Sequence, residues 1–192
     1  MPRPVIYVRH AMAAPEEGVH PTSWRLDAEG RRSAQRLAQR LEVGPAGVEG
    51  AEARIGALVT STEPKAVATA EEIGAAWSAE VVADPRLREA VRPWIGPGYR
   101  AVVHRYLRRE LPPGWEPHVD VARRMAEALA DAAAGTDGPL VIVSHGLALA
   151  VHLDARLGGG FDAEHFWSSL AFPDAWLLDE TGLLHRCDRA RA

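Results

Sequence analysis

The sequence predicts an α/β fold, a three-layer sandwich in which a mostly parallel central sheet carries helices on both faces. Apolar runs rich in β-branched residues, over residues 5–8 and 140–143, have the length and composition of buried strands. Each run leads through a polar loop into a segment whose apolar residues recur at helical spacing. Strands that alternate with helices in this way are typical of parallel sheets covered by helices.

The other elements are expected to follow the same alternation. Residues 57–60 and 81–82 are predicted strands. Asp27 can cap a helix that continues to about residue 41, and Pro64 suits the first turn of a helix that ends near Trp77. Further helices are predicted over 99–109, 118–133, 146–157 and 163–167, and a terminal hairpin over 175–178 and 183–185. Residues 84–98, with three prolines and two glycines, are expected to be irregular.

The length of 192 residues fits one domain, residues 1–192, in which residues from about 84 to 135 are expected to form a small helical and irregular cap. A chain of this size buries roughly 70% of the surface that it exposes when unfolded, so its core needs neither disulfides nor a metal. Cys187 is the single cysteine, which excludes a disulfide within the chain.

Charge and hydropathy argue against nucleic acid or membrane partners. The net charge is −4, which gives no bulk attraction to nucleic acid or anionic lipid. No apolar stretch approaches the roughly 20 residues of a membrane helix, and the first apolar run is too short for a signal peptide. We therefore expect a soluble cytoplasmic protein. The terminal hairpin offers an apolar edge that could pair with a second copy as a homodimer, and the sequence leaves the oligomeric state open.

Two histidines directly follow predicted strands. His10 comes after Arg9 at the end of the first strand, where an arginine fork suits phosphate oxygens and a histidine can attack phosphorus. His145 lies at a predicted helix start, where free N–H groups favour anions and Gly146 would let the backbone approach a ligand closely. Taken singly, the first pair could be a surface Arg-His pair, and the second histidine could merely cap a helix.

Two further charged residues lie near predicted strand ends. Of the 22 basic residues, 21 are arginine and Lys65 is the only lysine, near the start of a helix. Glu89, in the irregular stretch, could protonate a leaving oxygen. A solvated lysine and an exposed glutamate are the plain alternatives.

Together these residues resemble the histidine phosphatase superfamily, also called the phosphoglycerate mutase-like family, from residue 5 to about residue 176. The segment Val8-Arg9-His10-Ala11 is similar to the family's Arg-His-Gly signature, with alanine in place of glycine. Residues 24–30 resemble the segment that leads into the family's first helix. Residues 61–66, followed by 69–70, resemble its second-arginine motif, and residues 144–146 its second histidine motif. Glu89 falls where the family's proton donor often lies.

The resemblance implies a small phosphatase-type enzyme with a phosphoglycerate mutase-like fold and no metal or other cofactor. His10 would attack the phosphoryl group of a small phosphorylated substrate and form a transient phosphohistidine. Arg9, Lys65, His145 and Gly146 would surround the phosphate. Glu89 would protonate the leaving oxygen and then activate the water that releases phosphate.

Two departures from the family pattern keep alternatives open. Lys65 replaces the usual arginine, which keeps the charge but loses the planar two-point grip, and Arg86, Arg88 or Arg92 could compensate. Ala11 replaces the glycine after the nucleophile.

The leading hypothesis is a phosphomonoesterase for a small metabolite or for a broad range of substrates. The alternatives are a phosphohistidine protein phosphatase, a catalytically impaired sensor of phosphorylated ligands, and a mutase. Aromatic residues around a pocket (Trp94, Trp115 and Trp167 are the candidates) would favour a small substrate, and a shallow open site a phosphoprotein.

Overall fold

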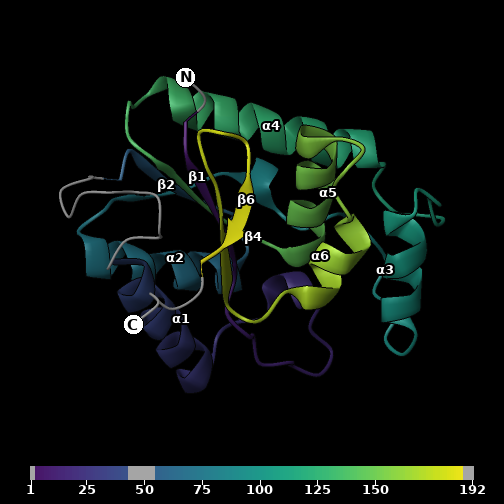
Figure 1. The fold of residues 1–192 in the computed structure, drawn as a ribbon. Coiled ribbons are helices and arrows are strands. Elements are labelled where there is room, and N and C mark those ends of the chain that lie inside the picture. Colours follow the sequence, from purple (N-terminus) through teal and green to yellow (C-terminus); the bar gives the residue numbers. More distant parts are fainter. Residues whose placement is uncertain (1–2, 43–54, 188–192) are drawn as a thin grey trace.

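The computed structural model describes residues 3–42 and 55–187, and Figure 1 shows how their elements are arranged. The strands are β1 (Val5–Arg9), β2 (Ala57–Thr60), β3 (Val81–Ala83), β4 (Leu140–Ser144), β5 (Asp174–Leu178) and β6 (Leu184–Arg186). The helices are α1 (Ala28–Glu42), α2 (Pro64–Trp77), α3 (Tyr99–Leu107), α4 (His118–Ala134), α5 (Gly146–Leu157) and α6 (Ala163–Ser169). Two short 3-10 helices are η1 (Pro21–Ser23) and η2 (Pro85–Leu87).

The strands form one mixed, mostly parallel sheet in the order β3-β2-β4-β1-β5-β6. The first four strands of this order run parallel to one another, and β5 and β6 add an antiparallel edge. In the β1–β4 register, Arg9 lies beside Ser144, so the next residues, His10 and His145, emerge together at the carboxyl edge. This is the edge at which open α/β sheets bind ligands.

Helices cover both faces of the sheet, which gives the three layers (Figure 1). Because side chains alternate along a strand, Val5 and Tyr7 of β1 pack on one face, and Ile6 and Val8 on the other. The first face is buried by α3, α4, α5 and α6, and the second by α1 and α2. The predicted fold class is thereby confirmed.

The element boundaries agree with the sequence expectations with small differences. Asp27 caps α1 as expected, since its carboxylate accepts the Gly30 N–H at 2.7 Å. The helix expected over 99–109 ends at Leu107 because Arg109 has a positive φ of 72°, a left-handed conformation that cannot continue a helix. None of the helices in the described part of the chain is long and apolar enough to cross a membrane.

Candidate active site

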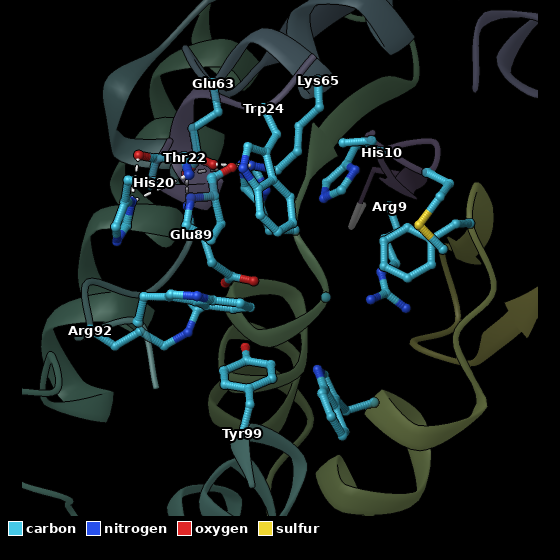
Figure 2. Close-up of a pocket in the computed structure, with 18 of the residues that line it drawn as sticks. Arg9, His10, His20, Thr22, Trp24, Glu63, Lys65, Glu89, Arg92 and Tyr99 are labelled. Atoms are coloured by element: carbon cyan, nitrogen blue, oxygen red, sulfur yellow. Dashed lines mark hydrogen bonds and ion pairs between the residues drawn. The ribbon is translucent and has the colours of Figure 1, made fainter. Parts of the chain in front are cut away.

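The carboxyl edge of the sheet opens into a pocket of about 210 Å³ (Figure 2). It gathers residues from the ends of β1, β2 and β4, from η1 and from the loop between η2 and α3. The residues predicted for the site from the family resemblance all line this pocket: Arg9, His10, Lys65, Glu89, His145 and Gly146. The rings of His10 and His145 meet edge to face, with centroids 5.0 Å apart.

A hydrogen bond to the backbone defines which ring nitrogen of His10 carries the proton. Its Nδ1 lies 2.7 Å from the carbonyl oxygen of Ala11, and a carbonyl oxygen only accepts. The proton of the neutral ring is therefore on Nδ1, and Nε2 carries the lone pair. Burial first, and then the charge of Lys65, lower the pKa of His10 to about 3, so the ring is neutral at physiological pH.

The turn that carries His10 is tied to α2. The N–H of Ala11 donates to the Thr69 hydroxyl at 3.0 Å, and that hydroxyl donates to the carbonyl of Lys65 at 2.7 Å. Ala11 itself is fully buried, so the methyl group that replaces the family's glycine packs in the core behind the site. This link fixes the turn after β1 relative to the start of α2.

Arg9 lies flat against an aromatic ring at the edge of the pocket. Its guanidinium carbon is 3.4 Å from the centroid of Phe172, and one terminal nitrogen donates to the Leu170 carbonyl at 2.9 Å. Gly146 makes room for it, since a Cβ there would lie 3.1 Å from Arg9 Nε. Burial lowers the pKa of Arg9 to about 10, which leaves the group charged at pH 7.

Lys65 is the second residue of α2, where Pro64 starts the helix directly after β2. Its ammonium group pairs with the carboxylate of Glu63 and donates to the Pro21 carbonyl at 2.8 Å. Both side chains of the pair are 8% exposed. The sequence singled out Lys65 but not Glu63, although an acid two residues before the lysine at a strand end was a usable signal.

His145 is completely buried at the start of α5. Its Nε2 lies 2.9 Å from the Ser61 hydroxyl and 3.4 Å from a carboxylate oxygen of Glu63. Its Nδ1 is a buried atom without a hydrogen-bond partner in the structure. Burial is the largest cause that holds the pKa of His145 well below its usual value, followed by the electrostatic influence of His10 and then of Lys65.

Glu89 lies at the N-terminus of α5, where the sequence led us to expect phosphate. Its carboxylate accepts the N–H groups of Leu147 and Ala148, the second at 2.8 Å. The side chain therefore occupies helix N–H groups that were expected to face a ligand, and Figure 2 shows its carboxylate pointing into the pocket. Arg124 fixes this loop by donating to the carbonyls of Arg88 and Glu89.

Several aromatic side chains line the pocket. Trp24 and Trp94 meet edge to face at 5.7 Å, and Trp94 packs on Tyr99 at 5.9 Å. Trp94 and Trp167 line the pocket, while Trp115 lies buried behind Tyr99 and does not line it.

Arg92 is the one of the three candidate arginines that lines the pocket. Its guanidinium carbon is 4.9 Å from the Tyr99 ring centroid, and its buried Nε has no partner in the structure. Arg86 pairs instead with Asp84 and Asp131, and Arg88 with Glu116. Among residues 3–42 and 55–187, no group of three or more histidine, cysteine, aspartate or glutamate side chains is arranged to hold a metal ion.

Fold and site together define an α/β protein with paired histidines and cations at the carboxyl edge of its sheet. Residues 5–173 match the model of the histidine phosphatase superfamily (branch 1). The chain belongs to this superfamily, a family of histidine-dependent phosphatases. No curated protein matches the chain.

Solved structures share this fold at low sequence identity. A mycobacterial glucosyl-3-phosphoglycerate phosphatase complexed with VO3 superposes with a TM-score of 0.73 at 22% identity, and the match covers 98% of each chain. YhfR of Bacillus stearothermophilus gives 0.67 at 24% identity, over 95% of this chain and 94% of that one. A third structure, from Thermus thermophilus, gives 0.63 at 22% identity, over 97% of this chain and 99% of that one.

Proposed function

We propose that the protein is a phosphomonoester hydrolase that works through a phosphohistidine on His10 without a metal ion. The observation that carries this proposal is the orientation of His10. Its Nδ1 donates to a backbone carbonyl, so the lone pair of the neutral ring is on Nε2, and the low pKa keeps that lone pair available.

In the proposed first step, His10 Nε2 attacks phosphorus, and the bond between phosphorus and the ester oxygen breaks. Arg9 and Lys65 offset the charge on the phosphoryl oxygens in the transition state. Glu89 in its acid form gives its proton to the departing oxygen, which leaves as an alcohol.

In the second step, the Glu89 carboxylate takes a proton from a water molecule, which attacks the phosphorus of phosphohistidine. The bond between phosphorus and His10 Nε2 breaks, and inorganic phosphate and the free imidazole are released. The acid form of Glu89 is then restored for the next cycle, so the two steps balance in protons.

A small phosphorylated metabolite, or a range of them, is the proposed substrate class. The pocket of about 210 Å³ with Trp24, Trp94, Tyr99 and Trp167 in its wall supports a small leaving group over a phosphoprotein surface. Phosphatases of small metabolites among the structures that share this fold, such as the glucosyl-3-phosphoglycerate phosphatase, agree with this choice.

The test is hydrolysis of 4-nitrophenyl phosphate and of a panel of sugar and glycerol phosphates in the presence of EDTA. We expect activity that survives EDTA and is lost in His10→Ala. Glu72→Gln is a control that should keep wild-type rates, because the Glu72 carboxylate bonds to Arg31 and Gln35 of α1 and does not line the pocket. Equal hydrolysis by His10→Ala and the native protein would refute the proposal. Tight phosphate binding without hydrolysis of any substrate would favour the sensor over the enzyme.

A further inference from the structure

Glu63 is a buried carboxylate in a pocket proposed to bind phosphate, where a negative charge opposes the ligand. Its side chain is 8% exposed. It precedes α2 at the capping position but makes no capping hydrogen bond with its side chain. Instead, the carboxylate turns into the site, and Figure 2 shows it beside Lys65 and above Glu89. Burying a carboxylate costs free energy that its partners must offset, so the contacts of Glu63 indicate why it is there.

Three partners surround the Glu63 carboxylate. One oxygen pairs with Lys65 Nζ. The other accepts the backbone N–H of Glu89 at 2.8 Å and lies 3.4 Å from His145 Nε2. The carboxylate therefore contacts both a phosphate-site cation and the second histidine.

Pairing with Lys65 alone does not explain this arrangement. Lys65 is already fixed by the Pro21 carbonyl, and a carboxylate beside it reduces the positive charge available to a phosphoryl group. The carboxylate also contacts His145, whose Nε2 faces Glu63. The other ring nitrogen, Nδ1, is buried without a hydrogen-bond partner and is therefore available to a ligand.

The charged and titratable groups around His145 come from several elements. They are Glu63 and Lys65 at the start of α2, Arg9 and His10 at the end of β1, Glu89 and Arg92 in the loop after η2, and Arg124 in α4. Most of them are positive and favour a neutral ring in the free protein, and Glu63 is the carboxylate that contacts the imidazole.

We propose that Glu63 is a positioning residue that stabilises the imidazolium form of His145 when a phosphoryl group enters the pocket. A proton taken up from water gives the ring two N–H groups. Nε2–H then faces Glu63 and Ser61, and Nδ1–H donates to a phosphoryl oxygen. This inference rests on the proposed function, since it assigns the phosphoryl group to the same pocket.

Protonation of His145 would make the pocket more positive only when the anion is bound. In the free site, burial and the surrounding cations keep the ring neutral. In the complex, the phosphoryl charge on one side and Glu63 on the other offset that cost. Lys65 and the protonated His145 then share one carboxylate.

The dependence of kcat on pH tests this role in Glu63→Gln, which keeps the shape but removes the charge. The bound wild-type enzyme should lose activity at high pH as His145 releases its proton. In the variant, this basic limb should move to lower pH by about one to three units, the range for losing an opposite charge at this distance. At pH 8, kcat should fall more than tenfold, and KM should change less. Glu72→Gln should leave the limb in place.

A lower kcat with an unshifted basic limb would show a purely structural role and overturn the inference. A second measurement avoids reliance on the folding of the variant. In the wild-type protein with inorganic phosphate bound at pH 7, nitrogen NMR of His145, assigned by His145→Gln, should show both ring nitrogens protonated. A neutral ring would also overturn it. If either of these results is found while His10→Ala is inactive, the role of Glu63 is wrong but the proposed function stands. If His10→Ala is active, the proposed function itself is wrong.

Discussion

At the scale of single residues, Lys65 differs from an arginine in how many donors remain for a ligand. Its ammonium group has three protons, and Glu63 and the Pro21 carbonyl engage two of them. One donor is therefore left for a phosphoryl oxygen, whereas an arginine would offer a planar fork.

Replacing Lys65 with methionine should weaken phosphate binding. A hydrogen bond to a charged group contributes about 1.5–3 kcal/mol, so the inhibition constant of inorganic phosphate should rise by at least about tenfold. Lys65→Arg is the matched control and should keep most of the affinity because it keeps the charge. Wild-type affinity in the methionine variant would show that Lys65 does not contact the phosphate.

Glu89 gives a second residue-scale prediction, because the need for a general acid depends on the leaving group. Glu89→Gln should slow the transfer of phosphate from an alkyl phosphate to His10 about 100- to 10,000-fold. The loss in this first step should be much smaller for 4-nitrophenyl phosphate, whose phenolate leaves without a proton. Because Glu89 is also the proposed base of the second step, which both substrates share, the check is the single-turnover rate at which each substrate releases its leaving group. Equal losses of that rate for both substrates would mean that Glu89 positions the site and donates no proton.

At the scale of elements, α1 supports the loop that carries His10. Gly30, in its first turn, approaches this loop so closely that a Cβ there would lie 2.5 Å from the Met12 carbonyl oxygen. Position 30 is helical, so it does not require the conformational freedom of glycine. It requires a residue without a side chain, because the helix packs closely against the backbone after His10.

Gly30→Ala should therefore destabilise the protein, although alanine favours helices over glycine by about 1 kcal/mol. Forced displacement of backbone typically costs about 1–3 kcal/mol, which exceeds that gain. Urea unfolding should show a lower midpoint, and Gln39→Ala, exposed on the same helix, should stay within about 0.5 kcal/mol of the native protein. If Gly30→Ala were more stable than the native protein, the loop after His10 would be able to shift at little cost in free energy.

The same elements show what the sequence could and could not predict. Runs of four apolar residues, at 5–8 and 140–143, predicted the central strands of the sheet, and their carboxyl ends predicted that Arg9, His10 and His145 would meet. The place of Glu63 two residues before Lys65 was a usable signal for an ion pair. Its contact with His145 could not be predicted, because a carboxylate before a helix ordinarily caps it, and only the fold turns this one toward His145. Likewise, the choice of Arg92 over Arg86 and Arg88 depends on a loop without periodicity.

At the scale of the whole molecule, three buried histidines link stability to pH. Burial is the largest cause that lowers the pKa of His10 to about 3, that of His152 to about 4, and that of His145 well below its usual value. The unfolded chain, with ordinary values near 6.5, therefore binds more protons than the folded one as the pH falls below 6.5.

Stability should consequently be highest above pH 6.5 and decrease as the pH falls toward 4. Each of these histidines contributes a loss of up to about 1.4 kcal/mol per pH unit in that window. Urea unfolding at pH 7, 6 and 5 measures the slope, and His152→Gln, away from the pocket, should reduce it. Equal free energies of unfolding at pH 7 and pH 5 would contradict burial of these rings in their neutral form.

The most direct test of the account is to trap the phosphorylated enzyme. Rapid acid-free quenching during turnover of a phosphate-labelled substrate, followed by mass spectrometry of peptides at alkaline pH, locates the phosphoryl group. The account predicts an acid-labile, alkali-stable phosphoryl group on His10 that appears before inorganic phosphate and is absent from His10→Ala. A phosphoryl group on another residue, or turnover with no phosphorylated enzyme at any time, would contradict it.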